Sequence, residues 1–569
     1  MDDSDLTTDR VDHLPMVAQF LDDIGMVETI DSQVGVHPNE ILSTGQTAAA
    51  MVVMALGFVS RPLYLSPQFF ESKALGLIIG KSKTDKTPVI LPEHLNDDKL
   101  GRTLDEIYDL GPDTLFQTVA FAAARREKLN VPSLHVDTTT HSFYGSYDDD
   151  TAAGVSGRAD STEPCHATVE YGFSKDMRHD CKQLVQELLV SSDGDVPLMV
   201  KIHSGNESDV KVFQERVKDL KKQFVDASDL MPEFIAADSK FYNETNVKAC
   251  DQESPWWVTR VPDNITEAKE AFAEAYASQI WTSLPTGKGK DIVRYREVAV
   301  DRYGVPQRFI VVVSDSGLRR ARSTVERQTK AEAEQLEKSA RKLARMDFAC
   351  AADAELAAAE LFDKVKYHRL TGRQLSTENR YRGKGRPKGD SIPISTVRVT
   401  VTFEKLEPPA IEEIVWKKAM FIVGTNNTTS SAERVMSIYR KDQQGVERAF
   451  RFLKSPMYFA DAFFFKNTKR IVALLTLMTI ALLVYSLLQR KLRLAIAQRS
   501  QPIPDQKGKP TTKPTMNWVN QCFEGIDLIR QRGKLGVRYV FVRLGSFAKQ
   551  VLSLLGPQYT RRYSVEMLL

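Results

Sequence analysis

The stretch YRKDQQGVERAFRFLK (residues 439–454) decides our interpretation of the fold, because it has the pattern of an amphipathic helix. Its apolar residues recur at helical spacing and predict a stripe that faces a protein core. The members of this stripe are Val446, Ala449, Phe450 and Leu453. The segment is therefore predicted to be a helix that packs on a larger domain with one side.

The other side of this helix carries a lone carboxylate among polar and cationic side chains. Arg440, Gln443, Glu447 and Lys454 fall close together there, and Lys454 lies seven residues, or two turns, after Glu447. A carboxylate held beside cations suits a site that binds both a divalent metal ion and a phosphate backbone. One such glutamate is by itself more often an ordinary exposed residue, so the interpretation depends on carboxylates elsewhere.

Length and charge distribution describe a multidomain protein with one basic end. The chain has 569 residues, too many for one core, and its 42% hydrophobic and 27% charged residues are typical of globular proteins. Residues 1–100 hold 15 acidic against 7 basic residues, whereas residues 481–569 hold 15 basic against 4 acidic ones. A basic end is expected of a protein that binds a polyanion, and a solvated surface is the equally simple alternative.

The cysteines and the first residues favour a reducing compartment. The five cysteines are odd in number, widely spread and without a CxxC pair, which argues against a disulfide framework or a zinc site. The first ten residues, MDDSDLTTDR, are acidic and have no apolar signal core. We therefore expect a cytoplasmic protein.

One segment, residues 471–488, has 18 residues without a charge and is flanked by basic pairs. This length meets the minimum for a membrane span, and a membrane protein built on it is one alternative. A helix that is apolar all round also occurs in the core of a large α/β domain. We prefer the core helix and expect no membrane contact, because the segment directly continues the region of the glutamate helix.

The first half of the chain changes from helical to strand patterns. Residues 1–130 predict a helical N-terminal domain, and residues 131–261 predict three strands, a helix, a strand, a helix and a strand. This is the order of the ribonuclease-H-like fold. Two of the predicted strands end in an aspartate, namely Asp137 and Asp238.

The pattern is then interrupted. Residues 262–418 contain alternating strands and a helical tract over 318–368, and we interpret them as a mixed α/β insertion domain. The core resumes over 419–500, and residues 501–569 form a basic linker and a C-terminal element. Within the insertion, the loop RGKGRPKG (382–389) resembles a hook in which Arg386 enters a narrow minor groove, although a solvated loop is the simpler reading.

Three carboxylates are candidates for one catalytic metal site: Asp137, Asp238 and Glu447. Adjacent strand ends with a helix packed across them can bring such residues together. Oxygen ligands suit Mg²⁺ or Mn²⁺, whereas Zn²⁺ prefers histidine or cysteine. Two ions about 3.5–4 Å apart would activate a water or a sugar hydroxyl for in-line displacement at phosphorus.

At these residues the sequence resembles the DDE transposases of the insertion-sequence four superfamily, closest to its insertion-sequence 1634-like branch. The matching segments are HVDTTTHSFYG, HSGNESD, FIAADSKF and VERAFRFLKSPMYF. The resemblance implies Mg²⁺-dependent cleavage at the ends of an insertion sequence, strand transfer by cut-and-paste, and an insertion domain before the glutamate. It also implies transposon-end and target DNA as partners, a homodimer in the synaptic complex, and a prokaryotic protein at the nucleoid.

The YREK signature of that family maps only in part. Glu447 and Lys454 fit, whereas Gln443 stands at the arginine position and Arg440 at the tyrosine position. The arginines that can replace the missing phosphate contact are Arg440, Arg448 and Arg451. The altered positions leave a DNA-binding relative with impaired catalysis as the alternative function.

Two further residue types have weaker functional interpretations. Trp256 and Trp257 can stack on an unpaired base at a cut end, although core packing is the alternative for at least one of them. His203 can lie near the metal ions, but a histidine at the end of a strand is more often structural. We predict Trp257 as the DNA-contacting member of the pair.

Overall fold

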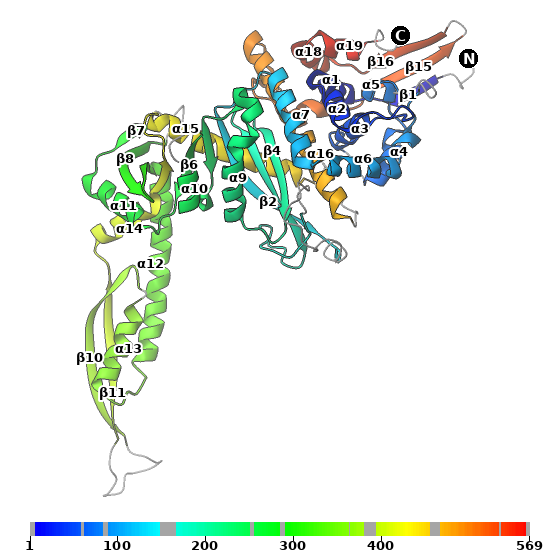
Figure 1. Ribbon diagram of the computed structural model, residues 1–569. Coiled ribbons are helices and arrows are strands. Elements are labelled where there is room, and N and C mark those ends of the chain that lie inside the picture. The colour runs from blue at the N-terminus through cyan, green and yellow to red at the C-terminus, as the bar shows by residue number, and fades with distance from the viewer. Residues whose placement is uncertain are drawn as a thin grey trace. The chain divides into compact units, whose positions relative to one another are not determined.

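The computed structural model of this mixed α/β protein divides into two compact units (Figure 1). Unit 1 comprises Met1–Thr259 and Thr429–Leu569, and unit 2 comprises Arg260–Thr428. The structure describes residues 6–58, 62–82, 89–147, 167–250, 255–284, 291–363, 365–380, 394–455, 467–533 and 536–564. The basic loop 382–389 with Arg386 lies outside these ranges.

The centre of unit 1 is a mixed sheet whose strands follow the order β4-β3-β2-β5-β6. The strands are β2 (Ser133–Phe143), β3 (Lys182–Ser191), β4 (Val196–Ser204), β5 (Phe234–Ala237) and β6 (Trp256–Val261). β2, β3 and β4 pair antiparallel, whereas β2, β5 and β6 pair parallel. The parallel connections run through α9 (Asp209–Gln223) and α10 (Glu244–Ala249), as such crossovers require. The predicted order of these strands and helices is confirmed.

β2 is longer than predicted. The sequence predicts a short strand that ends at Asp137, but β2 continues to Phe143. The residues after Asp137 include three threonines, whose branched side chains favour a strand, and they remain paired with β3 as far as Phe143. Pairing with β5 ends earlier, at Val136, so one edge of β2 is free of β5 from Asp137 onward.

Helix α16 (Thr468–Arg499) contains the uncharged segment and lies in the core of unit 1. Of the described helices it alone is long and apolar enough to cross a membrane, yet 94% of its most apolar window is buried inside the protein. It packs against β4, α3 (Thr44–Ala55), α6 (Asp97–Asp109) and α7 (Pro112–Arg126). The burial confirms a core helix, which is apolar all round because neighbours surround it.

The N-terminal helices begin and end at residues that the sequence marks. At α3, the Ser43 hydroxyl accepts a hydrogen bond from the Gln46 backbone N–H (3.1 Å), and the Gln46 side chain accepts one from the Ser43 N–H (3.2 Å). This capping box satisfies two N–H groups that the first turn leaves unpaired. After α6, Gly111 has φ +86°, a conformation that glycine adopts without strain.

The two ends of the described chain meet in unit 1 (Figure 1). Strand β1 (Leu6–Arg10) pairs antiparallel with β15 (Asp527–Gly533), which pairs with β16 (Gly536–Val542). Ion pairs join the acidic N-terminal region to the basic C-terminal region, including Arg562 with Asp22 (2.6 Å). Part of the basic excess therefore neutralises the protein's own carboxylates.

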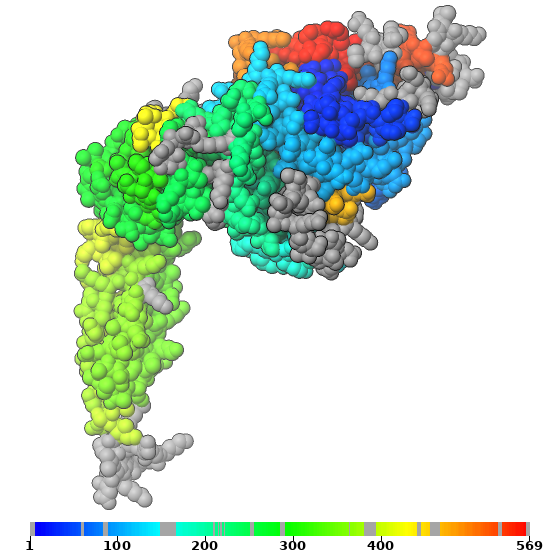
Figure 2. All heavy atoms as spheres, viewed as in Figure 1, coloured from blue at the N-terminus to red at the C-terminus, as the bar shows by residue number. Residues whose placement is uncertain are grey.

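Unit 2 contains an antiparallel sheet and a helix-hairpin stack. The sheet strands are β12 (Phe421–Thr425), β9 (Val305–Ser314), β8 (Val293–Arg302) and β7 (Thr282–Leu284). The helical tract predicted over 318–368 is two helices, α12 (Asp315–Leu343) and α13 (Ala351–Phe362). They pack against the hairpin of β10 (His368–Arg380) and β11 (Ile394–Lys405), and the space-filling view shows the outer surface of this stack (Figure 2).

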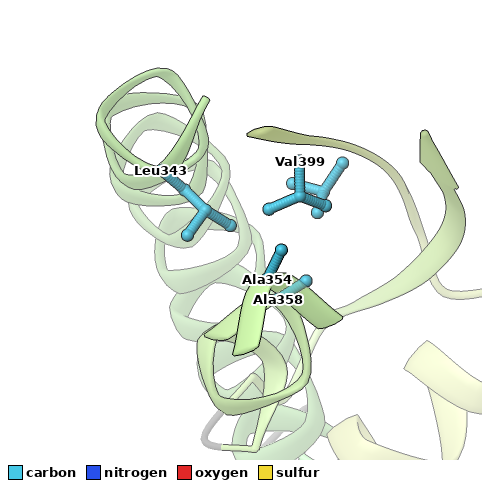
Figure 3. Packing of buried hydrophobic residues seen from close by; sticks show 5 residues of the cluster. Leu343, Ala354, Ala358 and Val399 are labelled. Atoms are coloured by element: carbon cyan, nitrogen blue, oxygen red, sulfur yellow. The ribbon is translucent and has the colours of Figure 1, made fainter. Parts of the chain in front are cut away.

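The core of this stack is small. Leu343 of α12, Ala354 and Ala358 of α13, and Val399 of β11 point toward one another and are buried (Figure 3). Alanines on α13 let the helix lie close to the hairpin, since a larger side chain would need space that the contact does not have. Near this contact the charged residues Glu337, Lys338, Arg341 and Lys342 of α12 are exposed.

Candidate active site

Helix α15 (Ala432–Leu453) positions the predicted glutamate. Ser431 caps the helix by accepting a hydrogen bond from the Arg434 backbone N–H (3.3 Å). The predicted apolar stripe is buried, with Val446 and Leu453 at 0% exposed, and the helix packs against β2, β3 and β5. Glu447 is exposed on the polar side of this fixed helix.

The two aspartates occupy equivalent positions on neighbouring parallel strands. The last register pair of β2 and β5 is Val136 with Ala237, so Asp137 and Asp238 are the next residue on each strand. Neighbouring strands lie about 4.8 Å apart, and residues in register on them point to the same face of the sheet. The β2–β5 ladder thus brings two half-buried carboxylates directly beyond the last paired residues of neighbouring strands, where we expect them to lie close together. We call Asp137 and Asp238 the carboxylate edge.

Backbone groups orient both carboxylates. Asp137 Oδ1 accepts a hydrogen bond from the Thr138 N–H (2.7 Å), and Asp238 Oδ1 accepts one from the Lys240 N–H (3.0 Å). The carbonyl of Asp238 also accepts a bond from the Thr259 hydroxyl of β6 (2.7 Å). Such short-range bonds limit the rotamers of the two side chains, which preorganises them for a ligand.

A lysine that the sequence did not predict lies at the carboxylate edge. Lys175 Nζ is 3.7 Å from Asp137 Oδ1 and donates to the carbonyl (2.6 Å) and the hydroxyl (2.5 Å) of Thr138. Thr138 lies on β2 beyond the end of the β5 pairing, where the strand edge is open to other groups. The lysine lies in a segment without helix or strand periodicity, so no sequence pattern signals its position.

The next residue of the same loop reaches the end of α15. Asp176 Oδ2 accepts a hydrogen bond from Lys454 Nζ (2.5 Å), and Lys454 is the residue that follows the last turn of the helix. The predicted phosphate-contacting lysine is therefore paired with a carboxylate in this structure. Because the Lys454 side chain is 28% exposed, the pair is accessible to an incoming anion.

A buried polar chain fixes β2 and β3 to α16 near these residues. His141 Nε2 lies 2.7 Å from Gln186 Oε1, and Gln186 Nε2 donates to the Thr479 hydroxyl (2.9 Å). The amide oxygen is then an acceptor, so His141 carries its proton on Nε2. Burial lowers the pKa of His141 to about 4, and the ring is neutral at physiological pH.

The donor set at this edge has the right chemistry for Mg²⁺ or Mn²⁺, since carboxylate oxygens are the ligands that hard cations prefer. Asp137 and Asp238 directly follow the last register pair of β2 and β5, and Glu447 extends from a helix that packs on these two strands. Across the described ranges, no three histidine, cysteine, aspartate or glutamate side chains lie close enough to hold a metal ion. The register of β2 and β5 thus brings the two aspartates to the ends of neighbouring strands, and the gathering of Glu447 with them stays a prediction.

Comparison with known protein families identifies the chain. The family described as "Transposase DDE domain" matches residues 159–484, which is more than half of the sequence. The chain belongs to this family of DDE transposases. The matched range contains Asp238 and Glu447 and begins after Asp137.

The other comparisons give less information about the function of the chain. A domain of unknown function, DUF4277, matches residues 6–121 of the transposase. Among solved structures, the piggyBac transposase synaptic complex with hairpin DNA is 9% identical, and the match covers 97% of this chain and 82% of that chain with a TM-score of 0.32. No curated protein matches the transposase. A TM-score of this size is too low to show a shared fold.

The arginines predicted to bind DNA have different surroundings in the transposase. Arg448 donates from Nε (3.0 Å) and Nη2 (2.7 Å) to Asp195 Oδ2 in the β3–β4 turn. Gly445 permits this approach, because a Cβ there would lie 2.7 Å from Asp195 Oδ1. Arg440 and Arg451 are exposed on α15. The side chain of Gln443 lies outside the described part of the structure.

The prediction that Trp257 contacts DNA is wrong for this transposase. The Trp257 ring is 0% exposed and packs against Phe241 and Tyr242, with ring centroids 6.3 and 5.8 Å away. A base cannot stack on a ring whose faces are covered by the core. Trp257 points inward because inward and outward positions alternate along β6, and its neighbour Trp256 is the partly exposed one.

His203 has a structural role in the transposase. Its Nε2 lies 3.1 Å from Glu187 Oε2, and Glu187 also accepts two bonds from Arg216 of α9 (2.7 and 2.9 Å). All three residues are buried. Burial would raise the pKa of Glu187, but the charge of Arg216 and the hydrogen bonds from His203 and Arg216 outweigh it and lower the pKa to about 2. This ion pair fixes α9 to the sheet.

Proposed function

We propose that this transposase binds the terminal inverted repeats of an insertion sequence and moves it by cut-and-paste transposition. The observation that supports the proposal is the register of β2 and β5, whose last pair, Val136 with Ala237, directly precedes the two aspartates of the carboxylate edge. The sequence segments around these residues and around Glu447 support the insertion-sequence four superfamily and its 1634-like branch.

The architecture of unit 1 supports a ribonuclease-H-like core. Its sheet has the strand order β4-β3-β2-β5-β6, with antiparallel pairs on one side of β2 and parallel pairs on the other, and its strands and helices follow one another along the chain in the order predicted for that fold. Unit 2 lies in the sequence between Asp238 and Glu447, where an insertion domain is proposed.

In the proposed reaction, Asp137, Asp238 and Glu447 hold two Mg²⁺ or Mn²⁺ ions. When bound, such ions activate a water or a 3′-hydroxyl and stabilise the leaving oxygen during displacement at phosphorus. The protein contributes position and charge. The β2–β5 register fixes the aspartates, α15 carries Glu447 on a packed helix, and Lys454 contacts the phosphate backbone by exchanging Asp176 for DNA.

The proposed partners are transposon-end DNA and target DNA, bound by a homodimer in the synaptic complex. The proposed location is the prokaryotic cytoplasm, at the nucleoid. The family match supports DNA as the substrate class, and the exposed arginines of α15 supply charge for its backbone.

The function is tested with a labelled duplex that carries the inverted repeats found beside the gene, incubated with the protein and Mg²⁺. We expect cleavage at the repeat ends, and loss of cleavage with Asp238→Asn, which keeps the size of the side chain and removes its charge. Asp109→Asn is the matched control, because Asp109 is an exposed aspartate on α6 away from this edge. Equal cleavage by wild type and Asp238→Asn would reject Asp238 as a metal ligand.

A DNA-binding relative with impaired catalysis is the second candidate. One observation favours it, namely that Gln443 stands where the family signature has an arginine. Specific binding of the repeats without cleavage in either Mg²⁺ or Mn²⁺ would select this alternative.

A further inference from the structure

A pocket of about 600 Å³ lies between α15, α16 and the segment that leads to α17 (Met516–Gln521). Its charged lining is almost entirely basic. The basic lining residues are Arg448, Arg451, Arg493 and Lys513, and Asp195 is the carboxylate among the lining residues. These cations come from three separate parts of the chain, so the fold concentrates positive charge at one place. We call this cavity the basic pocket.

The positive charge of the basic pocket is only partly neutralised. Asp195 accepts both of its arginine bonds from Arg448, and Arg493 Nε donates to the Pro514 carbonyl (2.9 Å). In the part of the chain that the structure describes, Arg451, Arg493 and Lys513 have no carboxylate within ion-pair distance. Burial lowers the pKa of Arg493, which means that the protein holds this cation where solvation is reduced. An anion in the pocket would restore the lost interaction.

The segment that carries Lys513 is fixed to the pocket wall. The Met516 N–H donates to Gln489 Oε1 (3.1 Å), and the Asn517 N–H donates to the Tyr485 hydroxyl (3.1 Å). Both acceptors lie on α16, and Tyr485 packs on Phe452 of α15 with ring centroids 5.0 Å apart. The backbone that follows Lys513 is therefore fixed to α16 before a ligand arrives, which lowers the cost of ordering this segment on binding.

We propose that the basic pocket binds phosphate groups of the DNA backbone at a place separate from the carboxylate edge. Guanidinium groups pair with phosphate oxygens through parallel N–H bonds, and lysine adds a point charge. α15 connects the two places, because it packs on β2 and β5 and also carries the pocket residues Arg448 and Arg451. The assignment to DNA rests on the proposed function, whereas the anion chemistry rests on the pocket alone.

The test is a double variant, Arg493→Gln with Lys513→Gln, in the full-length protein. The probe is a labelled random-sequence duplex of 30 base pairs, and its affinity is measured by fluorescence anisotropy over a range of salt concentrations. We expect binding to weaken about tenfold or more at physiological salt, and the slope of log K against log salt to fall by about 2, one for each phosphate contact. Lys507→Gln with Lys509→Gln is the matched control, because these exposed lysines precede the same segment and do not line the pocket.

A further variant tests whether misfolding explains a loss of DNA binding. Arg451 is exposed, so Arg451→Gln should leave the thermal unfolding temperature unchanged and lower the salt slope by about 1. A slope and affinity equal to those of the lysine control in both pocket variants would overturn the proposal.

Two further measurements are needed. One distinguishes DNA from a small phosphate compound as the ligand of the pocket, and the other distinguishes the pocket proposal from the proposed function. Inorganic phosphate and pyrophosphate are tested by thermal shift. If they stabilise wild type but not the double variant, and DNA affinity is the same in both, the pocket serves a small phosphate ligand and the DNA assignment fails. Cleavage of the repeat duplex reports on the proposed function. Cleavage with an unchanged salt slope rejects only the pocket, and a reduced slope without cleavage rejects only the catalytic function.

Discussion

The carboxylate edge and the basic pocket both border α15 but have opposite charge and different construction. At the edge, Asp137 and Asp238 are fixed by strand register, and the nearby cation is Lys175. At the pocket, four long basic side chains from three segments surround one carboxylate. The edge suits cations at a defined spacing, whereas the pocket suits an extended anion.

From this difference we expect that substitutions can separate the proposed chemistry from the proposed DNA retention. A carboxylate fixed by backbone register cannot be replaced by a neighbour, so its removal should abolish a step. In a cluster of flexible cations each side chain contributes part of the binding energy, so removing one should lower the DNA affinity only partly. The predictions below test whether substitutions divide in this way.

The largest effect is expected from a substitution that destabilises the fold, because the carboxylate edge and the basic pocket both depend on it. Glu187→Ala leaves the buried Arg216 without its partner and should destabilise the protein by about 3–5 kcal/mol. Urea unfolding followed by circular dichroism measures this loss. We expect cleavage and DNA binding to decline together in this variant, and a loss of cleavage alone in folded protein would contradict the structural role.

The same pair predicts a pH dependence of stability. The pKa of Glu187 is about 2 in the folded protein and near its ordinary value of 4.5 when unfolded. The stabilisation is therefore complete above pH 4.5 and disappears as the pH falls toward 2, a loss of about 3 kcal/mol. Unfolding free energies of wild type and Glu187→Ala should converge over this interval. Parallel pH profiles would show that the pair does not titrate in this way.

A substitution at Glu447 should affect only the catalytic region. Glu447→Gln keeps the helix and removes the charge of a proposed metal ligand, so we expect cleavage to fall about 100-fold or more. The affinity for the uncleaved duplex should change less than twofold, as measured by gel shift. An equal loss of binding and cleavage would mean that Glu447 contributes to DNA retention and would merge the two regions.

The predicted phosphate contact at Lys454 should have a smaller effect. Lys454→Ala removes a partly exposed cation at the end of α15, and we expect affinity for cleaved ends to weaken about fivefold with a salt slope lower by about 1. Mn²⁺ binding, measured by calorimetry without DNA, should stay the same. Lys507→Ala provides the control for a general loss of charge.

The smallest effect is expected at the cation of the carboxylate edge. Lys175 lies 3.7 Å from Asp137 and competes electrostatically with a metal ion, so Lys175→Met should tighten Mn²⁺ binding by up to about fivefold. Calorimetry in the absence of DNA measures this change. Weaker binding would instead show that Lys175 orients Asp137 for the metal.

Local patterns in the sequence predicted much of the fold. Helical spacing placed the buried stripe of α15, and the run of uncharged residues predicted a core helix that the structure buries as α16. The strand order around Asp137 and Asp238 followed from alternation and turn residues. The length of β2 was missed, because the threonines after Asp137 have no apolar alternation although they pair with β3.

The parts that were missed depend on contacts between distant residues. Lys175 reaches Asp137 from an irregular loop, and Arg448, Arg493 and Lys513 meet only in three dimensions. Trp257 is buried because its position on β6 faces the core. Two consecutive tryptophans give no alternation of apolar and polar residues, so the sequence does not show which of them faces inward. The gathering of Asp137, Asp238 and Glu447 into one metal site stays a prediction, as do the domain boundaries.

Because β1 pairs with β15, the N-terminal strand can fold into its sheet only after the C-terminal region has been synthesised. Residues 6–10 emerge early from the ribosome, yet their partner strand at 527–533 is made more than 500 residues later. Until then this segment is without its partner strand β15, and an unpaired strand can pair with another chain. We therefore expect an interrupted reading frame to yield insoluble product, so that a damaged gene copy releases no soluble fragment that competes with intact protein for DNA.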